Sequence, residues 1–167
     1  MVLNRQKAVR VSVSELERFL ERARRKLRIP SGALTVCFVS NAQMARWNRA
    51  FRKKAGPTDV LSFPADEASA GSRPERQSRA RRSATAKKIG FSFASFASTS
   101  AGSYLGDIAI APAVARRNAR RFGRTVLDEL RILILHGALH LLGYDHESDD
   151  GEMDRLEQAA RRSLGLN

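Results

Sequence analysis

Every histidine of this 167-residue chain falls in one short segment near its C-terminus, at positions 136, 140 and 146. His136 and His140 are four residues apart, so on a helix they lie on one face, about one turn apart. Gly143 can end that helix and let the chain fold back, which brings His146 toward the same point. Three neutral imidazoles of this kind bind one zinc ion and leave a fourth coordination position for water. The pattern predicts a catalytic site for one Zn²⁺. The alternative is two core histidines and one surface histidine that share no ion.

The residue after the first histidine indicates which bond such a site would cleave. Zinc lowers the pKa of a bound water toward about 7 and polarises an oxygen of the substrate. The histidine spacing matches that of metzincin proteases, but those enzymes carry a glutamate as general base where this chain has Gly137. A phosphodiester needs neutralisation of charge more than it needs a carboxylate base, because its transition state is strongly anionic. The missing glutamate therefore favours a phosphodiester substrate over a peptide.

The distribution of charge points to the same substrate class. The chain has a formal net charge of +13 and a sequence pI of about 11.2. Residues 1–56 contain 14 basic and 3 acidic side chains, whereas residues 136–167 contain 3 basic and 7 acidic ones. A basic half of this kind is typical of a protein that binds nucleic acid, since each Lys or Arg near a phosphate releases a counterion. Solvated helix faces and a coding bias toward arginine are the alternative explanation.

Composition excludes several other classes of protein. Apolar residues make up 43% of the chain and charged residues 28%, as in ordinary globular domains. The single cysteine, Cys37, excludes an internal disulfide and fits a reducing compartment, so we expect a cytoplasmic protein. The longest apolar run, residues 132–142, is too short to span a bilayer and contains two of the histidines. The first residues do not resemble a signal peptide, and no membrane association is expected.

Hydrophobic periodicity and turn residues predict the elements that position the histidines. Ser14 and Glu17 match a capping box at the start of the first helix, and Pro112, Thr125 and Gly143 are typical of helix boundaries. Trp47 and Cys37 are expected in the core. Strands mixed with helices in this order indicate an α+β or α/β layered domain. The expected helices cover residues 14–28, 41–52, 112–122, 126–142 and 149–164, and the expected strands cover 34–40, 60–63 and 106–110.

One long segment, residues 65–104, differs in composition from the rest. It is dominated by Ser, Ala, Gly and Arg with little periodicity, so we expect a low-complexity insertion that is largely disordered or loosely packed. Phe91, Phe93 and Phe96 lie near Lys87 and Lys88. Aromatic side chains beside basic ones can stack on RNA bases. A strand or an unstructured arm is the alternative interpretation.

Three separated segments, residues 57–64 (PTDVLSFP), 105–108 (LGDI) and 136–146 (HGALHLLGYDH), resemble the YbeY family of bacterial and organellar endoribonucleases. These enzymes are also described as ribosomal RNA maturation factors. The resemblance implies one α+β domain over residues 1–167, with helices packed on a small mixed sheet and the metal site at the end of a long central helix. In the family, the segment between the first two motifs is usually much shorter than here.

The resemblance also assigns roles to individual residues. It implies that His136, His140 and His146 bind the metal, and that Arg52 is functionally important. A guanidinium can make a bidentate contact with the scissile phosphate. Without the resemblance, the sequence favours a solvated surface position for Arg52. The catalytic candidates are Arg52 and His136; the candidates for orienting a histidine or moving a proton are Asp145, Asp59, Asp107 and Glu147; and the RNA-binding candidates are Arg49, Arg52, Lys53 and Lys54.

Three functional hypotheses follow. The first is a zinc-dependent endoribonuclease specific for single strands, which matures the 3′ end of small-subunit (16S) ribosomal RNA and takes part in ribosome quality control. Its partners would be single-stranded RNA and the small subunit or its assembly proteins. The second is a non-catalytic RNA-binding assembly factor in which zinc only holds the C-terminal turn. The third is a metalloprotease-like hydrolase, against which Gly137 argues.

Overall fold

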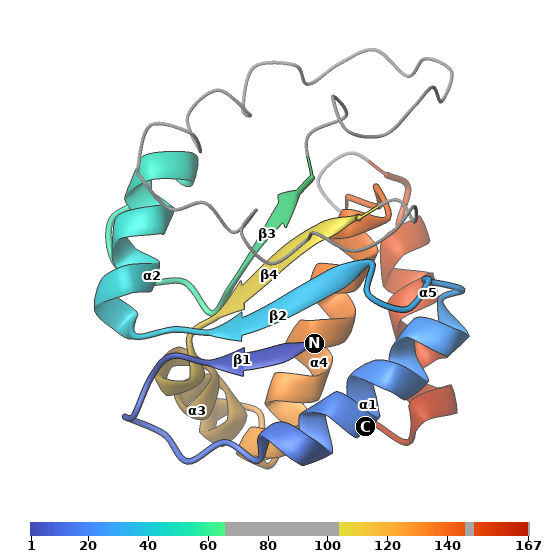
Figure 1. Ribbon diagram of the computed structural model, residues 1–167, viewed down its shortest axis with the longest axis horizontal. Coiled ribbons are helices and arrows are strands. Elements are labelled where there is room, and N and C mark those ends of the chain that lie inside the picture. The colour runs from blue at the N-terminus through green and yellow to red at the C-terminus, as the bar shows by residue number, and fades with distance from the viewer. Residues whose placement is uncertain (66–103, 146–148, 167) are drawn as a thin grey trace.

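Four strands form one mixed sheet in the order β1-β2-β4-β3 (Figure 1). The computed structural model describes residues 1–65, 104–145 and 149–166. Strands β1 and β2 are parallel to each other and to β4, whereas the edge strand β3 runs antiparallel to β4. The strands are β1 (Val2–Asn4), β2 (Leu34–Phe38), β3 (Val60–Pro64) and β4 (Gly106–Ile110).

The helices form layers on both faces of this sheet. Helices α1, α4 and α5 lie on one face, with α4 running beneath β3 and β4, and α2 lies on the other face (Figure 1). Helix α3 connects the end of β4 to α4 and packs along α4. The α-helices are α1 (Val13–Lys26), α2 (Asn41–Trp47), α3 (Pro112–Arg121), α4 (Val126–Leu141) and α5 (Glu152–Leu164).

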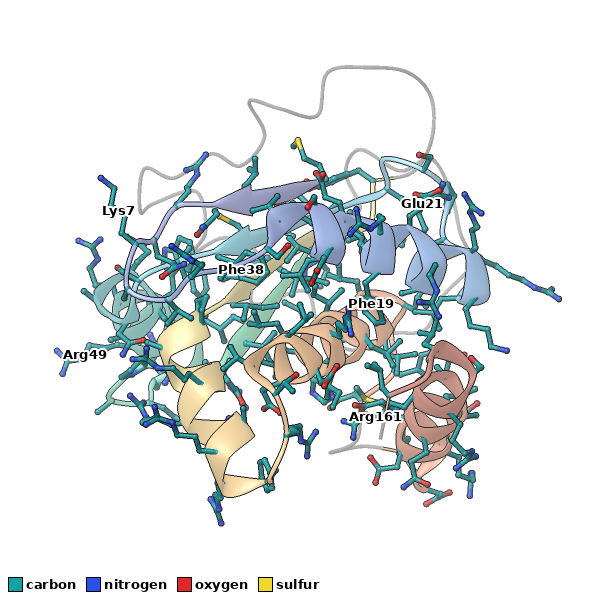
Figure 2. The ribbon with its side chains drawn as sticks, turned by 90° about the horizontal axis from the view of Figure 1, so that it is seen from below. Lys7, Phe19, Glu21, Phe38, Arg49 and Arg161 are labelled. Atoms are coloured by element: carbon teal, nitrogen blue, oxygen red, sulfur yellow. The ribbon has the colours of Figure 1, made fainter. Side chains whose placement is uncertain are left out.

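Successive side chains along β2 and β4 point to opposite faces of the sheet, and this divides the hydrophobic core into two clusters. Val36 and Phe38 of β2 face α1 and α4, together with Ile108 of β4. Figure 2 shows Phe19 of α1 pointing into this larger cluster, between α1 and α4. The neighbouring Cys37 points to the opposite face and joins Trp47 of α2 in the smaller cluster. Both Cys37 and Trp47 are buried, as predicted, because successive strand residues face opposite sides.

The strands and helices confirm most of the predicted elements, and the differences lie at their ends. The capping box of Ser14 and Glu17 is wrong, because α1 begins at Val13 with Ser12 as its N-cap. The Glu17 carboxylate instead accepts a hydrogen bond from the Val2 backbone N–H at 3.4 Å. The three-residue strand β1 that contains Val2 was not predicted, since so short a segment has no detectable alternation.

Helix α2 continues into a π-helical turn, η1 (Asn48–Arg52), so the helix predicted over 41–52 is correct in extent. Ser40 rather than Asn41 is its N-cap, and the Ser40 side chain accepts from the Gln43 N–H. Thr125 caps α4 as predicted by accepting from the Asp128 N–H at 3.1 Å. These side-chain caps satisfy backbone donors that have no partner within the helix.

The predicted insertion falls almost entirely outside the described residues, and so do Phe91, Phe93 and Phe96. The single α+β domain with helices on a small mixed sheet agrees with the expected fold class. In the part of the chain that the structure describes, no helix has the length and apolar character needed to cross a membrane.

Candidate functional site

Helix α4 carries both His136 and His140 in its last two turns, on the side away from the sheet core. The helix runs unbroken from Val126 to Leu141 because almost every residue that faces the sheet or α1 is Leu, Ile or Ala and is buried. It ends where Gly143 adopts a φ of 93°, a left-handed conformation that glycine accepts without steric cost. The predicted stop at Gly143 is confirmed.

The two imidazoles face each other through their Nε2 atoms, which lie 3.1 Å apart. His136 Nδ1 is 3.0 Å from Oε2 of Glu157, and His140 Nδ1 is 3.0 Å from the carbonyl oxygen of Tyr144. A carboxylate and a carbonyl can only accept, so both Nδ1 atoms must donate. In the neutral rings, each Nε2 then has a lone pair and no proton to donate to the other Nε2. Two such lone pairs at contact distance favour a cation between them.

The donor set fits a zinc ion. Two nitrogen ligands at about 2.05 Å in tetrahedral geometry lie about 3.3 Å apart, which is close to the separation of the two Nε2 atoms. Hydrogen bonds from the remote nitrogen of each ring to a carboxylate and to a backbone carbonyl are the usual support for histidine ligands, because they hold the tautomer and the ring orientation.

The third predicted ligand, His146, lies outside the described residues, as does Glu147. Within residues 1–65, 104–145 and 149–166, no group of three or more His, Cys, Asp or Glu side chains is arranged to hold a metal ion. The structure therefore brings together two of the three predicted ligands, and the three-histidine site stays a prediction.

Glu157 of α5 is the acidic partner of the histidine pair, and sequence reasoning missed it. Its carboxylate joins His136 to Arg161, which lies one turn further along α5. Figure 2 shows Arg161 at the boundary between α4 and α5. Burial opposes ionisation of Glu157, but the hydrogen bond from His136 and the charge of Arg161 outweigh it and hold the pKa of Glu157 below its usual value. Glu157 therefore accepts from His136 as a carboxylate. Its 21-residue separation from His136 left no local signal.

Replacing Glu157 by glutamine is expected to weaken zinc binding about 10- to 100-fold, because the ring of His136 loses a charged acceptor that raises its basicity. Competition with a chromophoric chelator measures the change. Glu152→Gln is the matched control, since Glu152 is exposed on the same helix. Equal zinc affinity of the Glu157→Gln and wild-type proteins would exclude a supporting role for Glu157.

Gly137 lies against β4, and its position explains why no general base follows the first histidine. A Cβ atom there would come within 2.7 Å of Ile108 Cγ2. The Ser62 hydroxyl of β3 donates to the Gly137 carbonyl at 3.2 Å, so this turn of α4 sits directly on the sheet. A glutamate at this position would point into packed hydrocarbon rather than toward the histidines. The local packing thus excludes the arrangement of a metzincin protease.

Arg52 lies at the end of η1, on the opposite face of the sheet from α4. Phe51 and Trp47 pack edge-on against Phe63 of β3, with ring centroids 5.1 and 5.7 Å apart, and so attach η1 to the edge strand. Arg52 is exposed, together with Arg49, Lys53 and Lys54. The η1 turn that carries Arg52 and the helix α4 that carries the histidines therefore lie on opposite faces of β3. The catalytic role of Arg52 stays a prediction.

Two of the aspartates predicted to orient a histidine have other hydrogen-bond partners. Asp59 accepts from the Val60 N–H and from the Asn118 amide, both at 2.9 Å, and so joins the start of β3 to α3. Buried Asp107 accepts from the Tyr104 hydroxyl at 2.5 Å. Burial raises the pKa of Asp107 despite this hydrogen bond, and it also raises the pKa of Tyr104.

Asp145 directly follows the turn at Tyr144 that supports His140, and its carbonyl accepts from the Asp149 N–H at 3.1 Å. Asp149 in turn caps α5, since its carboxylate accepts from the backbone N–H groups of Gly151 and Met153, each at 2.8 Å. Helix α5 itself begins at Glu152 with Gly151 as its N-cap, so the start predicted at Asp149 or Asp150 is two to three residues too early. A role for Asp145 in orienting a histidine stays a prediction.

A row of arginines on α3 is a second feature that sequence reasoning did not assign. The row consists of exposed Arg116, Arg117, Arg120 and Arg121, and the last of these lines a pocket together with His136. The run RRNARR was visible in the sequence, but its relation to the histidines depends on how α3 packs along α4.

The fold and the site define an α+β domain whose longest described helix ends in an anchored histidine pair. The sequence profile described as "Endoribonuclease YbeY" matches residues 1–165. A relative from Solibacter usitatus, named Endoribonuclease YbeY, is 38% identical over 152 residues, which are 90% of this chain and 78% of the relative. A relative of the same name from Koribacter versatilis is 36% identical over 166 residues, which are 99% of this chain and 86% of that protein.

A solution structure of a protein from Thermotoga maritima is also similar, with a TM-score of 0.54 and 27% identity over 98% of this chain and 87% of that one. The chain belongs to the YbeY endoribonuclease family. It is accordingly an enzyme that hydrolyses RNA, as the resemblance of its three motifs implied.

Proposed function

We propose that this enzyme is a zinc-dependent endoribonuclease that cuts single-stranded RNA, acts in maturation of the 3′ end of small-subunit (16S) ribosomal RNA and contributes to ribosome quality control. The observation that carries the zinc dependence is the pair of Nε2 atoms 3.1 Å apart, with both Nδ1 atoms engaged by acceptors. The ribosomal role rests on the family resemblance, and so do the proposed small-subunit or assembly-protein partners. A cytoplasmic location stays a prediction from the single cysteine.

The residues divide into holding and positioning roles. His136 and His140 would hold the ion together with His146, while Glu157 and the Tyr144 carbonyl keep the two rings in the required tautomer. Zinc, when bound, supplies Lewis acidity that neutralises phosphate charge and makes water more acidic. Exposed Arg52, with Arg49, Lys53 and Lys54, would bind RNA phosphates on the far side of the β3 edge. Contacts of this kind are sequence-independent and should weaken as salt rises.

The test is cleavage of a labelled single-stranded RNA by protein whose zinc content has been measured, before and after treatment with a chelator. We expect about one zinc per chain, cleavage that is lost on chelation, and recovery when zinc is returned. Cleavage that continues unchanged in the stripped protein would contradict the proposal. RNA binding without turnover, combined with a lower melting temperature after chelation, would instead support the non-catalytic assembly factor.

A further inference from the structure

A pocket of about 400 Å³ opens beside the histidine pair, between α3, α4 and α5. It is lined by His136 and Arg161 and by Arg121, Phe122 and Arg124, which lie at the turn from α3 to α4. This volume lies in the range of pockets that bind small organic groups. The pocket is thus large enough for part of a nucleotide next to the predicted cleavage site, on the opposite side of the sheet from Arg52.

The acidic side chains that line this pocket are engaged by neighbours within the protein. Glu157 is held by His136 and Arg161, and Asp59 accepts from the Asn118 amide. Glu129 is buried with Arg124 Nη1 3.4 Å from its carboxylate. The rim that remains accessible is formed by exposed Arg121 and Phe122. An RNA strand that approaches this rim therefore meets a guanidinium and an aromatic ring first.

Phe122 is the most exposed large apolar side chain among the described residues, with 54% of its surface accessible. Two guanidiniums lie over its ring: the Cζ atoms of Arg124 and Arg121 are 4.9 and 5.6 Å from the ring centroid. Phenyl rings and guanidinium planes are the surfaces on which proteins stack unpaired RNA bases. Hydrophobic packing does not explain a phenylalanine at this position, because α3 already buries Val114, Ala115 and Ala119 on its inner face.

We propose that Phe122, Arg121 and Arg124 form a base-stacking platform that holds one unpaired base of the RNA strand next to the histidine pair. Arg121 would bind a phosphate adjoining the stacked base. This inference rests on the proposed function, since it names a subsite for its substrate. It assigns single-strand preference to a defined surface, because a base that is paired in a duplex is not free to stack on a protein side chain.

The test compares single-stranded oligoadenylate and oligouridylate of equal length, both labelled with fluorescein, for binding to the full chain with a chelator present to prevent cleavage. Adenine offers the larger stacking surface, so the wild-type protein should bind oligoadenylate more tightly. Phe122→Leu keeps an apolar side chain but removes the ring, and it should weaken binding of oligoadenylate roughly fivefold or more and abolish the preference. Phe122→Trp should retain both the affinity and the preference.

Two controls separate stacking from other effects. Leu156→Ala truncates another exposed apolar side chain, on α5 and outside the pocket, and should leave both affinities unchanged. Arg121→Gln should lower the slope of log affinity against log salt by about one, as expected for loss of one phosphate contact. If the wild-type protein binds both oligomers and the Phe122→Leu variant binds them with the same affinities, the base-stacking platform is wrong but the proposed function is not affected. A wild-type protein that binds neither oligomer would overturn the proposed function and the platform with it.

Discussion

The His140→Ala variant is expected to lose RNA cleavage by at least about a thousandfold while keeping its fold. A bound metal contributes several kcal/mol of transition-state stabilisation, and each 1.36 kcal/mol corresponds to about a tenfold change in rate. His140 is half-buried at the end of α4, where its imidazole contacts His136 and the Tyr144 carbonyl. Its removal should therefore affect the ion far more than the core. The measurement is single-turnover cleavage of labelled RNA at saturating zinc, with the zinc content of each protein determined in parallel.

The double variant His136→Ala/His140→Ala provides a sharper criterion. If the two rings share one ion, the double variant should be no slower than either single variant, because groups that act as a unit do not lose activity additively. Leu142→Ala removes a partly exposed side chain two residues from His140 and should cleave at the wild-type rate. Independent, multiplicative losses from the two histidines would contradict a shared ion.

Among substitutions of a described glycine by alanine, Gly106→Ala is expected to cause the largest loss of stability. Gly106 is the first residue of β4 and pairs with Pro64 of β3. It has a φ of 140°, and a Cβ there would come within 2.1 Å of the Phe63 carbonyl oxygen and 2.9 Å of Pro64 Cα. Both are backbone atoms, so β3 itself would have to move. Overpacking and a strained φ each cost about 1–3 kcal/mol, and together they should lower the melting temperature by roughly 10 °C.

Gly32→Ala is the control for the conformational part of this loss. Gly32 also has a positive φ, 76°, but a Cβ at that position would contact no atom within 4 Å. The difference in melting temperature between the two variants therefore reports the clash with β3 together with the less accessible φ of Gly106. Displacement of β3 should also lower RNA cleavage by the folded Gly106→Ala protein. The Ser62 hydroxyl of that strand donates a hydrogen bond to the Gly137 carbonyl, in the turn of α4 that carries His136. Equal destabilisation of the two variants would show that the β3–β4 contact is not tight.

Sequence patterns predicted those features of the fold that depend only on residues close together in the chain. The spacing of His136 and His140 places both rings on one helical face, and Gly143 ends that helix, because both effects depend only on backbone geometry within a few residues. Of the boundaries that failed, the capping box of Ser14 and Glu17 is the one in which a distant backbone group uses the same side chain. The Glu17 carboxylate accepts from Val2 in β1, which the sequence did not predict as a strand.

The acceptor for His136 shows what local reasoning could not reach. Aspartates close in sequence to the motifs were the natural candidates, yet the carboxylate in contact is that of Glu157 on α5. Asp107 is instead directed toward Tyr104, and Asp59 toward Asn118 of α3. Which carboxylate meets the ring depends on how α5 packs against α4, and no spacing rule encodes a contact between separate helices.

Residue types and their spacing were enough to predict the family, the helical placement of the histidine pair, the layered fold class and the basic character of the chain. Each of these follows from residue type and short-range periodicity. The packing of the helices on the sheet established that Glu157 supports His136, that η1 and α4 lie on opposite faces of β3, and that Phe122 lies at the rim of the pocket beside His136. These relations arise from long-range packing of helices on a sheet, where residues far apart in the chain become neighbours because their elements bury apolar surface together.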